Sequence, residues 1–583
     1  MLSKTRKQTL GLRKILDLRL GGAADNVTLM AAMCSGMVAN PLFSGGAWMM
    51  PLAVVAAAAG STRLAQRAYS ALGRRVFNSP VFINSDVPSV NLRRDWGGML
   101  IGYTVDTCRP VVVPWDDWVQ HGLIIGRSGM GKTVLGTWLQ FQQIMRGGGI
   151  FNIDAKVDGD NMTMVTAMCA YAGRRHHLRL INPGDPNLSN TYSPILDGDA
   201  DEVASRAISL IPSAENNAGA DHYRQAANEA MTIFTRAIKA TGLAYTFRDL
   251  SILLQNEQAM TYLQNLLPAN SEAAGMYKIF LERFRIVDKS GKTHVDVNKL
   301  LNMFGGIAGR MFSFGEGNFG RLTETYAPEV NLFDDITSNR IIYMALPTMA
   351  KQEAALNFAK MTVADWRSAL ARIQLLPSAA RPWPPTLGFF DEAGGYINQP
   401  WGRILEQARS ANQAIIPAIQ TRANIDAVSK ELGEMLMGNM ATLMSFALGT
   451  PDTIKAVADA IGEENVMQIS TSLSSGGGES ASAGTGIKQA SSRQSGFGYS
   501  EKLETVYKVR STDLAGLEKG EAIVSLNRRH VAHVKIPNVR FSDEFLKRVG
   551  TTEVNHVRKR VVRGLSLFKK FGGPNPASSA ASP

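Results

Sequence analysis

One short motif constrains the fold of this chain more than any other part of its sequence. Residues 126–133 read GRSGMGKT and fit the pattern G-x-x-x-x-G-K-[ST] at every fixed position. A short apolar run, residues 123–125, precedes the motif, and residues 134–139 (VLGTWL) follow it with a composition that suits a helix. A glycine-rich loop between a strand and a helix predicts an α/β fold with a parallel sheet.

The residue types in this motif suit the binding of a nucleoside triphosphate. Glycine lets the backbone wrap around phosphates and aim its N–H groups at them, and the helix that follows presents its positive end to the same charge. Lys132 is expected to reach the β- and γ-phosphates and Thr133 to bind Mg²⁺, which makes ATP and Mg²⁺ the expected cofactors. The predicted phosphate-binding residues are Gly126, Arg127, Ser128, Gly129, Met130, Gly131, Lys132 and Thr133.

A pair of acids ends another predicted strand. Residues 386–390 (TLGFF) are apolar and lead directly into Asp391 and Glu392. A buried strand of a parallel sheet would place both acids at its carboxyl edge, beside the glycine-rich loop. There Asp391 can hold the Mg²⁺ shell while Glu392 accepts a proton from the attacking water. An ordinary acidic helix cap is the alternative explanation of the pair.

Two further residues are candidates for the same site. Gln420 follows the apolar run 414–419, and an amide at that strand end can bind both the γ-phosphate and the attacking water. Arg409 closes a predicted helix shortly before this run and can stabilise transition-state charge, in its own subunit or in a neighbour's. The simpler alternatives are an amide bound to local backbone and an arginine in a surface ion pair.

One more predicted strand, residues 149–153, comes a single helix after the loop, so we expect it to be the next strand of the sheet. Its end carries Asp154, Lys156 and Asp158, which would face the same crevice. The sequence leaves the roles of these three residues open.

The region near the amino terminus has the character of a membrane anchor. Residues 26–62 contain no charged side chain. One spanning helix needs about 20 apolar residues, and an Asn-Pro pair and a Gly-Gly pair interrupt the stretch. We therefore expect two short spans, at about 25–41 and 46–62. The basic flanks predict that both ends of this hairpin lie in the cytoplasm. A signal peptide and a buried core hairpin are the alternatives.

The positive charge of the chain is concentrated at its two ends. The formal net charge is +12, with a net +8 in residues 1–75 and a net +7 in residues 547–583. The middle is therefore slightly negative, so the high isoelectric point does not indicate a surface that coats nucleic acid. The three cysteines are too few and too far apart for a disulfide scaffold or a zinc site.

Composition and periodicity divide the chain into several expected parts. Residues 201–330 show the apolar spacing of helices, whereas strand character dominates before and after them. A Gly/Ser-rich stretch reads as a flexible loop, and the end of the chain is basic and then rich in small residues. The expected organisation is a membrane anchor (1–75), a discontinuous nucleotide-binding domain (80–200 and 331–546), an inserted all-α domain (201–330), a flexible loop (474–500) and a basic, then disordered, tail (547–583).

The ordered set of motifs resembles the coupling proteins of type IV secretion and conjugation systems, of the TraD and TraG type. The resemblance rests on the paired spans, the helical insertion and the motifs HGLIIGRSGMGKT, FNIDAKVDGD, NPGDPNLSNTYSPI, LGFFDEAGGY, EQARSANQAIIPAIQT and GEAIV. These proteins are membrane-anchored ATPases of the additional-strand P-loop class. The resemblance implies an α/β fold: a RecA-like P-loop ATPase domain with an inserted all-α domain, preceded by a transmembrane helical hairpin.

The resemblance also implies an activity, a location and partners. Such a protein hydrolyses ATP with Mg²⁺ as a homo-hexamer at the bacterial inner membrane, with both termini and the ATPase domain in the cytoplasm. Its partners would be a relaxase–DNA complex or protein effectors, single-stranded DNA and components of the secretion channel. In this comparison Lys132, Glu392, Arg409 and Gln420 are catalytic, and Thr133 and Asp391 hold the metal.

Two departures from the family pattern bear on the cargo. Ala155 stands where the family commonly has a proline, and the segment between the spans is short. Both favour the branch of effector-secretion and IncI-like systems. The competing functions are a double-stranded-DNA translocase of the septal type and a nucleotide-dependent scaffold with little turnover.

Overall fold

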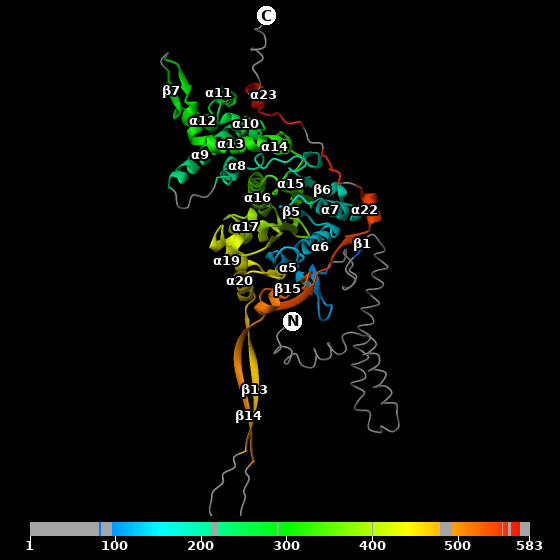
Figure 1. The fold of residues 1–583 in the computed structure, drawn as a ribbon. Coiled ribbons are helices and arrows are strands. Elements are labelled where there is room, and N and C mark those ends of the chain that lie inside the picture. Colours follow the sequence, from blue (N-terminus) through cyan, green and yellow to red (C-terminus); the bar gives the residue numbers. More distant parts are fainter. Residues whose placement is uncertain are drawn as a thin grey trace, which may run out of the picture.

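A mixed 11-stranded sheet forms the centre of the molecule in the computed structural model (Figure 1). The structure describes residues 81–82, 96–211, 218–288, 291–398, 400–477, 493–550, 552–557 and 561–571. The strand order across the sheet is β3 (Pro110–Pro114), β2 (Gly98–Thr104), β16 (His530–Lys535), β15 (Glu521–Leu526), β12 (Thr442–Ser445), β4 (Gly122–Ile125), β11 (Gln413–Ile419), β10 (Thr386–Phe390), β5 (Ile150–Asp154), β9 (Ile341–Ala345) and β6 (Leu178–Ile181).

The strands from β12 to β6 are all parallel, and those from β15 to β3 are antiparallel. Strand β11 lies between β4, which precedes the glycine-rich loop, and β10, which ends in the two acids. The prediction that β5 would be the neighbour of β4 was wrong, because β5 pairs with β10 and β9. The chain that leads from β4 to β5 therefore passes over two positions in the sheet. Strands β11 and β10, which come later in the sequence, occupy these positions.

Both faces of the parallel strands are covered, which is typical of such sheets. Along β4, Leu123 and Ile125 pack into one core and Ile124 into the other, as the alternation of side chains in a strand requires. The second core contains side chains of α6 (Lys132–Met145) and α7 (Gly159–Tyr171). The first contains side chains of α16 (Gln352–Gln374), α17 (Trp401–Gln407), α19 (Lys430–Asn439) and α20 (Pro451–Ile461). Shorter helices are α5 (Trp115–Trp118), α15 (Leu332–Thr337), α18 (Ala423–Asp426) and α21 (Ser511–Ala515).

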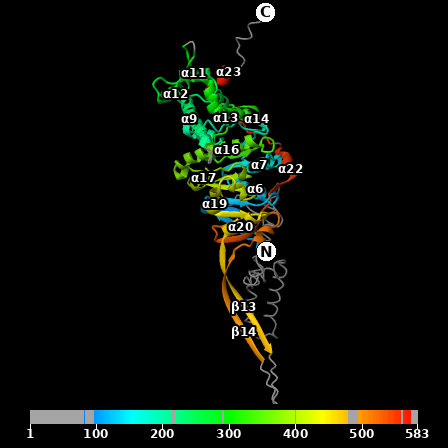
Figure 2. The ribbon, with the colours of Figure 1, turned by 60° about the vertical axis from the view of Figure 1, so that its left-hand side comes forward.

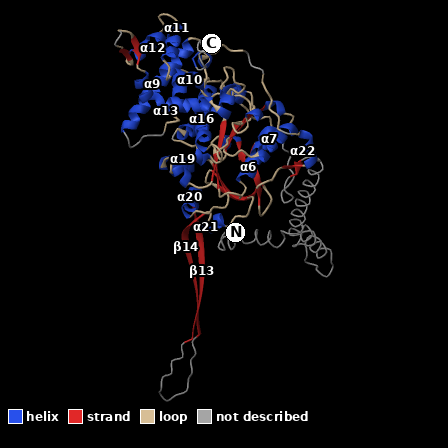
Figure 3. Ribbon diagram, turned by 45° about the horizontal axis from the view of Figure 1, so that its top comes forward, coloured by secondary structure: helices blue, strands red, loops and turns tan. Residues whose placement is uncertain are grey.

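The chain between β6 and β9 forms a block of helices at one end of the molecule (Figure 3). A short antiparallel hairpin, β7 (Arg285–Val287) with β8 (Thr293–Val295), lies among these helices. The prediction of an all-α insertion was therefore wrong for this hairpin. The helices of the block are α8 (Ala200–Ile208), α9 (Ala218–Ala240), α10 (Phe247–Leu253), α11 (Glu257–Leu266), α12 (Glu272–Glu282), α13 (Val297–Gly315) and α14 (Gly317–Thr323).

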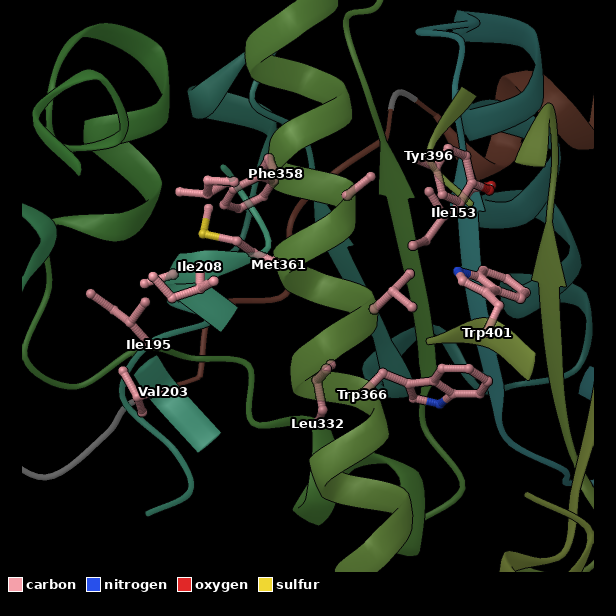
Figure 4. Close-up of a cluster of buried hydrophobic side chains, with 14 of the residues drawn as sticks. Ile153, Ile195, Val203, Ile208, Leu332, Phe358, Met361, Trp366, Tyr396 and Trp401 are labelled. Atoms are coloured by element: carbon pink, nitrogen blue, oxygen red, sulfur yellow. The ribbon is translucent and has the colours of Figure 1, made fainter. Parts of the chain in front are cut away.

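Helix α16 joins the helical block to the sheet through one continuous core. In Figure 4, Phe358 and Met361 project from one side of this helix toward α8, and Trp366 projects from the other side toward the sheet. The Trp366 ring stacks on Phe151 of β5, with ring centroids 5.3 Å apart. The buried ion pair between Arg206 of α8 and Asp365 of α16, at 2.9 Å, crosses the same boundary. The position of the block is thus determined by packing and by charge pairing.

A long two-stranded ribbon leaves the body of the molecule (Figures 1 and 2). It consists of β13 (Glu463–Gly477) and β14 (Arg493–Tyr507), which pair in antiparallel register from Glu463–Tyr507 to Gly477–Arg493. The prediction of a flexible loop over residues 474–500 was therefore wrong for 474–477 and 493–500. Residues 478–492 lie outside the described part of the chain.

The chain after the sheet runs back across the molecule toward the helical block. Strand β17 (Arg540–Phe541) pairs with β1 (Val81–Phe82), and α22 (Asp543–Val549) packs against α7. At the end of this path α23 (Leu567–Phe571) packs against α10 and α11.

Specific contacts hold this returning segment. Glu329 accepts hydrogen bonds from the backbone N–H of Val557 (2.7 Å) and from His556 Nδ1 (3.0 Å). Asp249 accepts one from the N–H of Leu567 (2.8 Å), whose side chain is fully buried. The described residues of the basic part of the predicted tail are thus held against the body of the molecule. The predicted disordered end, residues 572–583, lies outside the described chain.

Among the described residues, no helix is both long enough and apolar enough to cross a bilayer. The two predicted spans, 25–41 and 46–62, lie outside these residues. They remain a prediction from the sequence.

Candidate active site

The glycine-rich loop leads from the end of β4 into the first turn of α6. Gly129 and Gly131 have φ angles of +79° and +119°, which favour residues without a Cβ. A Cβ on Gly126 would lie 2.6 Å from Cβ of Phe446, so only glycine fits there. Lys132, the first residue of α6, donates hydrogen bonds to the carbonyl oxygens of Gly126 (2.7 Å) and Arg127 (3.3 Å). The ammonium group thus lies inside the loop that would surround the phosphates.

Asp391 and Glu392 lie directly after β10, at the same edge of the sheet as the loop. Asp391 is buried, and one of its carboxylate oxygens accepts a hydrogen bond from the N–H of Glu392 (3.0 Å). Glu392 has φ +50° and ψ +39°, in the left-handed region that few non-glycine residues adopt. This conformation turns the chain sharply after the strand. Backbone outliers of this kind cluster at functional sites.

Gln420 lies at the end of β11, between the loop and the two acids. Its Nε2 donates to both carboxylate oxygens of Glu392, at 2.8 Å and 2.9 Å. The sequence predicted an amide placed for the γ-phosphate and the attacking water. The structure shows instead that the amide contacts the carboxylate that was predicted to act on that water.

Lys156 is a site residue whose role the sequence left open. It follows β5, and its Nζ lies 3.0 Å from Oε1 of Glu392. Its own backbone N–H donates to Asp154 (2.9 Å), which also accepts from Tyr343 (2.6 Å) and Asn161 (3.1 Å). The signal in the sequence was the strand end at 154–156, but only the order of the strands shows that β5 lies directly beside β10.

The environments of the two acids move their pKa values in opposite directions. Burial raises the pKa of Asp391 to about 6, and the nearby charges of Asp154 and Glu392 add to the effect. Burial also tends to raise the pKa of Glu392, but hydrogen bonds from Gln420 and Lys156 and the charges of Lys156 and Lys132 outweigh it, so that this pKa lies below its ordinary value. Glu392 is therefore ionised at neutral pH, as a general base must be.

The residues predicted to hold Mg²⁺ fit that ion. Thr133 and Asp391 border the same small pocket, together with Asp154 and Asn161. Mg²⁺ usually binds one or two protein oxygens and completes its shell with water and substrate phosphates, and Thr133 and Asp391 offer oxygens of this kind.

Arg409 lies at the other edge of the sheet. It is exposed in a short 3-10 helix, Ala408–Ala411, that ends just before β11, whereas Gln420 follows the same strand. Seven strand residues at about 3.3 Å each separate the two ends by roughly 20 Å. Arg409 instead lies near His121, which precedes β4: burial lowers the pKa of His121, and the charge of Arg409 adds to the effect. The structure thus brings Lys132, Asp391, Glu392 and Gln420 together and does not bring Arg409 to its own subunit's site.

His121 connects the arginine segment to the strands of the site. Its Nδ1 accepts a hydrogen bond from the N–H of Ile415 (3.2 Å), so its Nε2 carries the proton and donates to the carbonyl of Leu405 (2.8 Å). The ring is 3% exposed, and burial lowers its pKa from 6.5 to about 4. The imidazole is therefore neutral in the folded protein.

We expect His121 to make stability depend on pH. The unfolded chain takes up a proton near pH 6.5 and the folded chain only near pH 4, so stability should fall as the pH falls between these values. At about 1.4 kcal/mol per pKa unit, the loss reaches roughly 3 kcal/mol. Denaturant unfolding of the wild type and His121→Gln at pH 7.5 and 4.5 measures the effect, with exposed His530→Gln as the control. An unchanged pH dependence in His121→Gln would contradict it.

Comparison with known proteins agrees with this geometry. A family model described as the TraM recognition site of TraD and TraG matches residues 385–498. The type 4 coupling protein DotL of Legionella pneumophila subsp. pneumophila (strain Philadelphia 1) is 24% identical over 403 residues, which is 61% of this chain and 50% of DotL. These matches support a coupling protein of the TraD and TraG type. The chain spans about half the length of its curated relative.

Solved structures show the same fold as this chain. The unbound bacterial conjugative coupling protein TrwBdeltaN70 matches with a TM-score of 0.54 and 15% identity, over 80% of this chain and 93% of that one. The plasmid coupling protein TrwB in complex with ADP and Mg²⁺ matches with a TM-score of 0.50 and 14% identity, over 80% and 93%. At this identity the likeness establishes the α/β architecture and the large, mostly parallel sheet. It confirms the α/β part of the predicted fold class for the described part of the chain.

Proposed function

We propose that this coupling protein hydrolyses ATP to drive substrates toward a type IV secretion channel. One observation carries the proposal: an ionised carboxylate, Glu392, and a buried acid, Asp391, lie at the same sheet edge as Lys132 in the glycine-rich loop. A strand that ends in a polar amide, Gln420, separates the two groups. This order suits hydrolysis, because the metal, the water and the phosphates each have a separate partner.

Each residue of the site has a separate role in the proposed hydrolysis. Lys132 exchanges the carbonyls of Gly126 and Arg127 for the β- and γ-phosphates. Thr133 and Asp391 would hold Mg²⁺, which would neutralise charge that develops on the phosphate oxygens. Glu392 accepts the proton of the attacking water at its carboxylate. Gln420, bonded to both oxygens of that carboxylate, sets the orientation of the base.

The similarity to DotL and TrwB supports the proposal that ATP hydrolysis drives the transfer of cargo. The cargo is a relaxase–DNA complex or a protein effector, and the working unit is a homo-hexamer attached to the inner membrane by residues 1–75. Residues 201–330 act as an inserted domain within the nucleotide-binding domain of 80–200 and 331–546. Assignment to the effector-secretion branch is part of the same proposal.

Lys132→Ala tests the proposal. We expect the variant to lose ATP binding and substrate transfer, because the phosphates lose their main cationic partner, while its amount in the membrane fraction stays unchanged. Transfer is measured in cells whose own copy is deleted, with exposed Lys455→Ala as the control. Normal transfer by Lys132→Ala would overturn the ATPase proposal.

A further inference from the structure

The proposed mechanism of hydrolysis gives Lys156 no role, although this residue lies in the site. Its ammonium group lies 3.0 Å from the carboxylate of Glu392, at the edge of the sheet where the acids lie. The side chain is 52% exposed, so the group faces solvent on its other side. A short turn holds it there, because Asp154 accepts the N–H of Lys156 and is itself bonded to Tyr343 and Asn161.

Stability does not account for this ion pair. Exposed or half-exposed pairs of lysine with a carboxylate contribute little, because water screens the attraction and the long side chain loses freedom. The anchoring of the turn, in contrast, is buried: Asp154 and Tyr343 are almost wholly inaccessible. Buried hydrogen bonds therefore position a lysine whose own ion pair adds little to the stability of the fold. That pattern is expected of a residue that binds a ligand.

The two lysines of the site approach its centre from opposite sides. Lys132 comes from the loop after β4, and Lys156 comes from β5, three strands away in the sheet. At about 4.8 Å per strand the separation of these strands is roughly 14 Å. Burial lowers the pKa of Lys132, the charges of Glu392 and Asp391 oppose the effect, and the charge of Lys156 adds to it, so these charged groups lie near one another. Two cations close to the same pair of acids are suited to an anion of high charge.

We propose that Lys156 is a ligand of the γ-phosphate and leaves Glu392 to bind it. The inference rests on the proposed ATPase function and names a further residue for it. The γ-phosphate is the group next to Glu392, because the water that Glu392 activates attacks that phosphate. A diphosphate held in the loop after β4 ends short of β5 and leaves Lys156 on the glutamate. Lys156 thus distinguishes ATP from ADP and releases the base only when the substrate is present.

The affinity of the full-length protein for two nucleotides tests this assignment. A non-hydrolysable ATP analogue and ADP are titrated, each with Mg²⁺, into the wild type, Lys156→Met and Lys156→Arg, with Lys455→Met as the exposed-lysine control. We expect Lys156→Met to lose about 10- to 100-fold in affinity for the analogue, which is the usual effect of removing one charge-assisted hydrogen bond. Affinity for ADP should stay within about twofold, and Lys156→Arg should recover part of the loss.

The same variants are assayed for turnover, which separates the possible roles. A lower kcat in Lys156→Met together with the selective loss of analogue affinity supports the assignment. An unchanged analogue affinity overturns it, and so does an equal loss for both nucleotides. A higher kcat with unchanged affinity also overturns it, because Lys156 would then only restrain Glu392. If the wild type itself binds neither nucleotide, the proposed function fails first, and the role of Lys156 falls with it.

Discussion

Glu392→Gln is expected to bind ATP and to hydrolyse it about 10²- to 10⁴-fold more slowly than the wild type, the range that a positioned general base usually contributes. Glutamine has the same shape but cannot accept the proton of the attacking water. Lys132, Thr133 and Asp391 are left intact, so affinity for a non-hydrolysable ATP analogue should change little. Phosphate release and equilibrium binding, measured on the same preparation, check the two halves of this prediction.

The control for this substitution is Glu406→Gln, an exposed glutamate on α17 in the described chain. It changes the net charge by the same amount without touching the site, so it should hydrolyse ATP at the wild-type rate. Wild-type turnover in Glu392→Gln would assign the base to another group. A parallel loss of binding and turnover would instead show that Glu392 helps to hold the nucleotide.

Arg409→Ala is expected to reduce ATP hydrolysis by about 10³-fold, the lower end of the range for an arginine that contacts the transferred phosphoryl group. The structure places Arg409 at the sheet edge opposite to its own subunit's glycine-rich loop, so such a contact has to be made in trans. Hydrolysis per subunit should therefore rise with protein concentration. Turnover measured over a dilution series, alongside sedimentation, checks this dependence.

Mixing two inactive variants makes the test specific. Arg409→Ala subunits keep a sound loop and Lys132→Ala subunits keep a sound arginine, so a mixed ring contains some complete sites and should recover part of the activity. Arg403→Ala, which removes a different exposed arginine, in α17, is the matched control and should stay active alone. Failure of the mixture to recover activity, when sedimentation shows mixed rings, would remove Arg409 from the reaction.

The returning segment and the ribbon show what local sequence patterns do not record. Residues 561–571 belong to the basic part of the chain end, yet Leu565 and Leu567 are almost fully buried against the helical block. Their partners, such as Asp249, lie some 300 positions earlier in the chain, and no local pattern records such a contact. In the same way, the Gly/Ser-rich composition near 474–500 predicted a loop, whereas the register of β13 and β14 includes part of it.

The sequence by itself determined the elements of the site. The glycine-rich loop, the acid pair after an apolar strand and the amide after another strand are local patterns, since each depends on the chain directly before and after it. Periodicity also determined the helical character of most of residues 201–330 and the α/β character of the rest.

Only the tertiary structure decided how these elements meet. The order of the parallel strands depends on which crossovers pack best, and it places β11 between β4 and β10 and moves β5 next to β10 rather than β4. This order brings Lys156 onto Glu392 and turns Gln420 toward the same carboxylate. It also separates Arg409 from its own subunit's site by the length of a strand, because the two ends of a strand lie at opposite edges of a sheet.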